Sequence, residues 1–150
     1  MIIKYFEINK EKFDYYNLFL IYWENEGLKK EIIQTLKKKF SGSIENYDEE
    51  QIISNNELFY EKLFNRSLFE IEKIIIVNRC SEKICGVIEK IIDKKISDIK
   101  IILNANALET KSKLRNLFEK KKELIIVQTY KDTSRAEEKI EKKDLSSRKR

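Results

Sequence analysis

Short apolar runs alternate with amphipathic stretches along most of the chain, and this alternation most constrains its fold. The runs NLFLIYW at 17–23 and KIIIV at 73–77 are apolar without a period of two, which is typical of strands buried on both faces. The remaining runs, one of them more polar, complete a set of five predicted strands, at 17–23, 43–47, 73–77, 99–103 and 124–128.

The stretches between these strands have apolar residues at helical spacing. Leu28, Ile32 and Leu36, for example, lie on one face of a helix that ends near Gly42. The same spacing predicts four helices, at about 28–40, 48–64, 82–92 and 110–121. Buried strands separated by helices predict an α/β fold, a five-stranded parallel sheet with helices on both faces. Residues 1–13 are extended in character and would add an edge strand.

Composition excludes several classes of protein. The chain has 150 residues, enough for one domain with its own core, and contains no His. It therefore lacks the commonest general base and zinc ligand, and we expect neither a Ser-His-Asp triad nor a metal site. Its longest apolar stretches are about half a dozen residues, too short to span a membrane, and no signal peptide is visible. In a reduced, cytoplasmic protein we expect Cys85 to be a small core residue on the inner half of a helix and Cys80 to be a helix-start residue.

The positive charge is concentrated at the end of the chain. Residues 133–150 hold seven Lys or Arg and four Asp or Glu, so they contribute +3 of the total of +5. The lysines elsewhere are scattered over the ends of predicted elements, and we interpret them as solvated surface rather than a DNA site. Because the apolar rhythm stops after Tyr130, we predict one domain at 1–132 followed by a charged tail at 133–150, either an exposed helix or disordered.

The loop after the first strand is where a nucleotide-binding P-loop would lie. Only Gly27 and a displaced Lys29 remain of such a loop, and this lysine is followed by another lysine rather than by Ser or Thr. Trp23 stands in the place of a turning glycine, while Glu24 and Glu26 would repel phosphate. We therefore expect no ATP binding and no cofactor.

The other strand ends supply no hydrolytic residues either. Asn78 and Arg79 follow the strand at 73–77, where magnesium-dependent NTPases place acidic residues. Asn104 and Asn106 follow the next strand, and we interpret them as turn formers. No intrinsic catalysis is expected from these positions.

The segment NRSLFE at 65–70 has an unusual composition for a connection between a helix and a strand. Such connections are usually polar, yet Leu68 and Phe69 are adjacent, bulky and apolar. The pair could fold back onto the core, or it could be exposed and enter an apolar pocket on another protein. The residues alone leave both interpretations open.

Four segments together resemble one family over about residues 17–130. The chain resembles the N-terminal domain of the delta subunit of bacterial DNA polymerase III, the clamp-loader subunit that binds and opens the sliding clamp. The matching segments are NLFLIYWENEGLKKEI, RSLFEIEKIIIV, KIILNANALETKSKLRNLFEKK and ELIIVQTY.

This resemblance implies a fold and a role in DNA replication. The family's domain is similar to the core of AAA+ ATPases with a degenerate nucleotide site, and it belongs to the DNA polymerase holoenzyme without catalysing a reaction itself. Its clamp-binding plug falls on Leu68 and Phe69, which would enter a pocket of the ring-shaped clamp, the beta subunit. The implied mechanism is mechanical, through differential binding to the open ring. The family's other partners are the remaining clamp-loader subunits, and contact with DNA is only indirect.

Two features depart from the family. Trp23 replaces the family's usual glycine, and the family's helical lid and collar domains have no counterpart in residues 133–150. We therefore expect a truncated form that does not assemble stably with other loader subunits. Two alternatives belong to other classes, a divergent P-loop phosphotransferase and a basic nucleic-acid-binding module that uses the tail.

Overall fold

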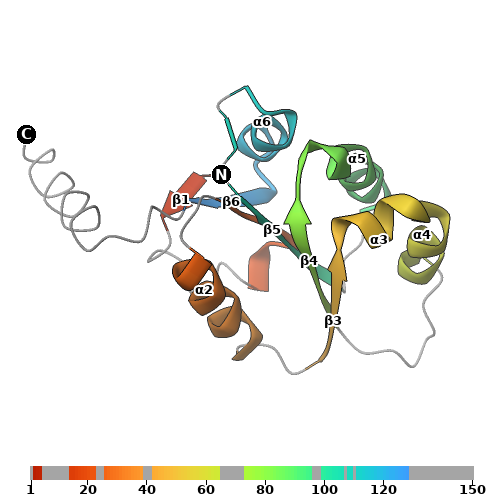
Figure 1. Cartoon of the computed structure of the whole chain (residues 1–150), viewed down its shortest axis with the longest axis horizontal. Helices are drawn as coiled ribbons and strands as arrows, with labels where there is room; N and C mark the ends of the chain where they lie inside the picture. Colours follow the sequence, from red (N-terminus) through yellow and green to blue (C-terminus); the bar gives the residue numbers. More distant parts are fainter. Residues whose placement is uncertain are drawn as a thin grey trace, which may run out of the picture.

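The computed structural model describes residues 2–4, 14–22, 26–38, 42–64, 73–95, 99–106, 108–109 and 111–128. Within them the strands are β1 (Ile2–Lys4), β2 (Leu18–Tyr22), β3 (Ser43–Asp48), β4 (Lys73–Cys80), β5 (Ile99–Ala105) and β6 (Leu124–Gln128). They form one sheet in the order β1-β6-β2-β5-β4-β3, and every neighbouring pair is parallel (Figure 1). The five predicted strands are confirmed, and β1 adds the expected edge strand beside β6.

Helices lie in all four connections in which they were predicted, but the connection from β3 to β4 contains two helices instead of one. They are α2 (Glu26–Lys38), α3 (Glu49–Ser54), α4 (Asn56–Phe64), the 3-10 turn η2 (Glu82–Ile84), α5 (Cys85–Lys94) and α6 (Lys113–Lys120). The single helix predicted at 48–64 is wrong, because Asn55 interrupts it. The Asn55 side chain accepts a hydrogen bond from the Leu58 backbone N–H at 3.3 Å and so caps a new helix instead of continuing the first.

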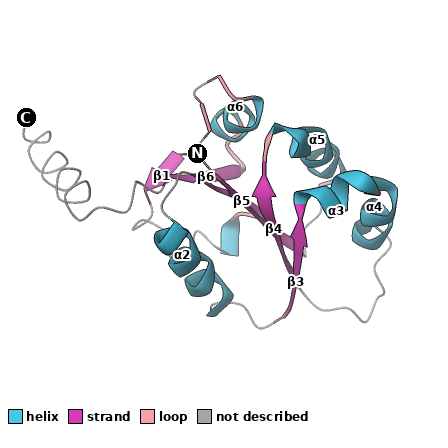
Figure 2. Cartoon of the chain, viewed as in Figure 1, coloured by secondary structure: helices cyan, strands magenta, loops and turns pink. Residues whose placement is uncertain are grey.

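The direction of the connections decides which face each helix covers. The connection from β2 through α2 runs outward to β3 at the edge, whereas the three later connections run back in the opposite direction. Right-handed crossovers place helices of opposite direction on opposite faces. Figure 2 shows this arrangement, with α2 on one side of the sheet and α3 to α6 on the other. The predicted helices on both faces are confirmed.

Each central strand contributes to two apolar cores. In β2, Phe19 and Ile21 pack toward α2, while Leu18, Leu20 and Tyr22 pack toward the other helices. This double burial explains why the sequence of the strand is continuously apolar rather than alternating. None of the described helices is long and apolar enough to span a membrane.

Candidate functional site

The carboxyl ends of β2 and β5 form the point where the topology reverses. These two strands are neighbours, with Ile21 beside Asn104, and the connections that follow them leave in opposite directions. Open α/β sheets bind ligands outside the strand ends at such a point. The predicted remnant of a P-loop lies here, so its geometry tests whether a nucleotide could bind. Trp23 lies outside the described residues.

Lys29 occupies this position and is bound to groups of the protein itself. Its side chain is only 1% exposed, and Nζ donates to the backbone oxygen of Ala105 at 2.8 Å and to Asn106 Oδ1 at 3.4 Å. Nζ also lies 2.9 Å from a carboxylate oxygen of Glu26. An ammonium has three N–H donors, and three acceptors surround this one. The lysine therefore links α2 to the end of β5 instead of offering its charge to a phosphate.

This contact of Lys29 was not predicted from the sequence, although the helical spacing of the apolar residues indicates that Lys29 faces inward. Lys29 has helical spacing with Ile32, Ile33 and Leu36, the buried residues of α2, so it lies on the inward face of the helix. Asn106 is likewise more than a turn former, because its side-chain oxygen accepts a hydrogen bond from Lys29.

A second cation at this edge also has internal partners. The Arg115 guanidinium carbon lies 5.2 Å from the ring centroid of Tyr22, at the end of β2. Its Nε donates to Glu119 at 2.9 Å and its Nη1 donates to the backbone oxygen of Leu108 at 3.2 Å. Arg115 therefore covers the end of β2 as a packed structural group.

The prediction that Asn78 and Arg79 follow the strand is wrong, because β4 extends to Cys80 and both residues lie near its carboxyl end. Asn104 Nδ2 donates to Asn78 Oδ1 at 3.1 Å, which ties the ends of β5 and β4 together. The next residue, Arg79, has a positive φ of 56° and forms an ion pair with Asp48 at the end of β3. Among the described residues there is no group of three or more side chains suited to hold a metal ion.

Cys80 and Cys85 are both free thiols, but their predicted places are reversed: Cys80 is buried at the end of β4, whereas Cys85 begins α5 and is only partly buried. Burial raises the pKa of the Cys80 thiol strongly, and the nearby Glu49 carboxylate raises it further. Glu49 is itself buried and accepts hydrogen bonds from the Ser81 N–H and hydroxyl, each at 2.7 Å. Burial also raises the pKa of Cys85. Because the thiolate is the reactive form, these raised pKa values lower the reactivity of both thiols at neutral pH.

The opposite, amino-terminal edge of the sheet contains both ends of the segment that includes Leu68 and Phe69. These two residues lie outside the described residues, so their role as a plug stays a prediction. The segment follows Phe64 at the end of α4 and precedes Lys73, which begins β4 beside Ile99 of β5.

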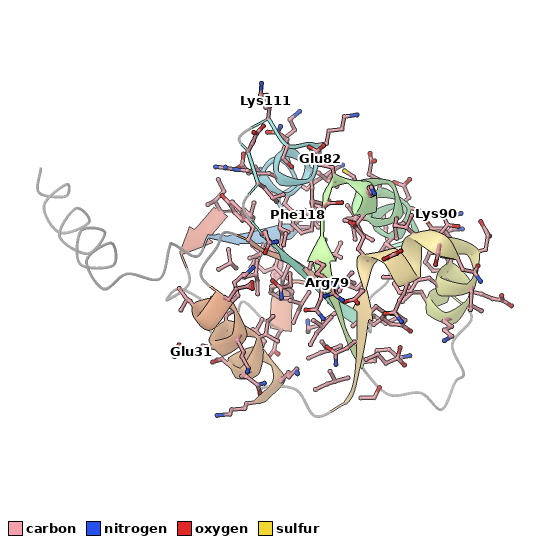
Figure 3. The ribbon with its side chains drawn as sticks, in the orientation of Figure 1. Glu31, Arg79, Glu82, Lys90, Lys111 and Phe118 are labelled. Carbon is pink, nitrogen blue, oxygen red and sulfur yellow. The ribbon has the colours of Figure 1, made fainter. Side chains whose placement is uncertain are left out.

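Aromatic and cationic contacts fix the end of α4. The rings of Tyr60 and Phe64 stack with centroids 5.7 Å apart and planes 5° apart. From α5, Lys90 Nζ lies 4.4 Å from the Tyr60 ring centroid and Lys94 Nζ lies 5.7 Å from that of Phe64. Figure 3 shows Lys90 where α5 adjoins α4. The segment therefore begins from a helix end that is held against α5.

A partly buried ion pair fixes the other end of the segment. Lys73 Nζ donates to Glu45 Oε2 at 3.2 Å, and the Tyr47 hydroxyl donates to Glu45 Oε1 at 2.9 Å. Burial alone would raise the pKa of Glu45, but the hydrogen bonds from Tyr47 and Lys73 outweigh it and lower the pKa below its usual value. Burial and, secondly, Glu45 raise the pKa of Tyr47 to about 12. These groups hold β3 and β4 together where the segment re-enters the sheet.

Comparison with known proteins supports a relation at the level of the fold. No family model matches the sequence. A search of curated proteins also gives no match. Among solved structures the chain is similar to the Bacillus subtilis DNA clamp loader delta protein (YqeN), with a TM-score of 0.61 and 11% sequence identity. The likeness covers 87% of this chain but only 43% of that one, so the chain spans less than half of its length. The predicted fold class, an α/β fold with a parallel sheet and helices on both faces, is confirmed.

Proposed function

We propose that this chain is a clamp-binding module related to the delta subunit of DNA polymerase III, which binds and opens the sliding clamp during DNA replication. The observation that supports this proposal most is the fold likeness to a clamp loader delta protein over 87% of the chain. The sequence adds a Ser-Leu-Phe segment between α4 and β4, in the order of elements that the resemblance implies.

The proposed contact is made by Leu68 and Phe69. Both ends of their segment adjoin packed residues, Phe64 against α5 and Lys73 against Glu45. Fixed ends lower the conformational entropy that binding has to remove, which favours the use of this segment as a plug. Burial of each side chain contributes about 1.5–3 kcal/mol. The two together would contribute about 3–6 kcal/mol, which is on the order of a hundredfold to ten-thousandfold in affinity.

The proposed module works without a nucleotide. Lys29 is bound by Ala105, Asn106 and Glu26, and a phosphate would have to displace these partners in the presence of the Glu26 carboxylate. Opening of the ring would then come from the chain binding the open form of the clamp more tightly than the closed form. ATP hydrolysis, if it is coupled to this step, would occur in other subunits.

A binding measurement tests the proposal directly. Isothermal titration of the purified chain with the sliding clamp of its own organism is expected to give a 1:1 complex. A Leu68→Ala/Phe69→Ala variant is expected to lose at least a hundredfold in affinity. The matched control is Ile2→Ala/Ile53→Ala, which shortens two exposed aliphatic side chains on β1 and α3.

Two results would contradict the proposal. One is a folded wild-type chain, verified by circular dichroism, that does not bind the clamp. The other is a Leu68→Ala/Phe69→Ala variant that binds as tightly as the control.

A further inference from the structure

An apolar pocket lies at the amino-terminal edge of the sheet, where both described ends of the segment containing Leu68 and Phe69 also lie. It has a volume of about 480 Å³, within the range of pockets that hold ligands or partner side chains. Its floor is formed by buried residues at the beginnings of β2, β5 and β6 together with α5, namely Leu18, Ile101, Leu124 and Ile91. The pocket is thus a hollow in the apolar core that opens toward the amino-terminal edge.

An exposed tyrosine stands at the rim of this pocket. Tyr15 is 72% exposed, more than any other large apolar side chain in the described part of the chain, and its ring centroid lies 4.8 Å from that of Tyr16. Exposed aromatic residues beside an apolar hollow are characteristic of binding hot spots, because a rigid ring buries much area at little entropic cost.

The pocket is continuous with both ends of the segment that contains Leu68 and Phe69. On one side Lys95 lines the pocket, and its neighbour Lys94 lies over the ring of Phe64, where α4 ends. On the other side Ile99 lines the pocket and pairs with Lys73, where β4 begins. Adjacent strands are about 5 Å apart. A partner that bound at both ends of this segment would therefore also lie against the pocket.

Charged residues at the rim of the pocket restrict which chemical groups a partner can place there. Lys95 lies at the rim with Lys94 beside it, and Glu123 lies on the β6 side. Lys95 caps α5 with a positive φ of 50°, and its N–H donates to the Ile92 backbone oxygen at 3.1 Å, so its backbone position is fixed. A carboxylate on the partner would be attracted to this pair of lysines.

We propose that this pocket is a second contact with the sliding clamp and that it receives one bulky apolar side chain of the clamp flanked by a carboxylate. The proposal rests on the proposed function and extends it: the plug enters the clamp, and the clamp in return enters the pocket. Reciprocal insertion fixes the orientation of the two proteins, which a single plug does not.

Affinity measurements on three variants of the full chain test this second contact. Tyr15→Ala is expected to weaken clamp binding at least about tenfold. Lys95→Asp reverses the charge at the rim, and aspartate tolerates the positive φ at this position. We expect this variant to lose a similar amount of affinity for the clamp, with a smaller loss in high salt. Lys111→Asp, at the opposite edge of the sheet (Figure 3), is the charge-matched control and is expected to bind as the wild type.

The possible outcomes separate the two proposals. If Leu68→Ala/Phe69→Ala abolishes binding while Tyr15→Ala and Lys95→Asp bind as the wild type, the pocket proposal is wrong and the plug stands. If the wild type does not bind the clamp, both are wrong. Sedimentation of the free chain adds a further arm, because a dimer that Tyr15→Ala dissociates would assign the pocket to self-association and overturn the proposal. Since Lys95 is exposed, its variant keeps the test valid even if Tyr15→Ala proves unstable.

Discussion

Replacing Lys29 by methionine tests whether this side chain is a structural link between α2 and the end of β5. Methionine keeps most of the length and apolar volume of the side chain but removes the ammonium that Ala105, Asn106 and Glu26 share. The backbone oxygen of Ala105 then loses its side-chain donor at a buried position. We expect the variant to fold with lower stability and still to bind no ATP.

The magnitude follows from the contacts. A hydrogen bond to a charged group contributes about 1.5–3 kcal/mol, and an orphaned buried acceptor costs about 1–3 kcal/mol. The ion pair adds little, because Glu26 is 68% exposed and regains water when the lysine is lost. The methionine variant no longer has to bury a charged ammonium, and this gain offsets part of the cost. We therefore expect a loss of about 2–3 kcal/mol, or about 4–12 °C in Tm.

Urea unfolding monitored by circular dichroism measures this loss. The midpoint is expected to fall while the slope m stays unchanged, because the surface exposed on unfolding is the same. Lys30→Met, at the exposed neighbouring lysine, is the control and is expected to unfold as the wild type does. A Lys29→Met variant as stable as wild type would refute the reasoning, since it would show that desolvation of the ammonium cancels its hydrogen bonds. Measurable ATP affinity in the wild type would refute the conclusion that the site is filled.

Two further predictions concern titratable groups. The pKa of Tyr47 is raised to about 12, so its contribution to stability is complete below pH 10 and is lost as the pH rises toward 12. Tyr47→Phe should show a smaller fall in the urea midpoint between pH 9 and pH 11 than the wild type or a Tyr15→Phe control; equal falls would contradict this. Burial raises the pKa of the Cys80 thiol, so in a Cys85→Ser variant we expect reaction with a thiol reagent only in denaturant, and rapid labelling of the native protein would disprove it.

The strands were predictable because parallel strands buried on both faces are encoded locally. Leu18 to Tyr22 and Lys73 to Val77 need apolar side chains on both sides, which makes each run visible without knowledge of its neighbours. Helix limits depend on smaller differences in free energy. Asn55 separates α3 from α4 because a single side-chain hydrogen bond favours the start of a new helix over continuation of α3. The periodicity of apolar residues does not reveal such a contact.

The candidate sites were predictable to different degrees. The absence of a phosphate-binding motif around Lys29 is a local property of the sequence. The contacts that this lysine makes are not local, because Lys29 meets Ala105 and Asn106 only when the sheet order places β5 beside β2. The pocket near Tyr15 is equally nonlocal, since three strands and a helix from distant parts of the chain form it.

The sequence by itself determined the fold class, the absence of a P-loop motif after the first predicted strand and the position of an apolar pair between α4 and β4. These properties reside in residue types and short spacings, and they hold wherever the segments lie. Only the tertiary structure decided that Lys29 is bound internally, that lysines of α5 hold the aromatic end of α4, and that an apolar pocket adjoins the ends of the segment containing Leu68 and Phe69. The physical reason is that burial, hydrogen-bond partnership and surface continuity belong to groups brought together from far apart in the chain, and a single sequence does not state which of them meet.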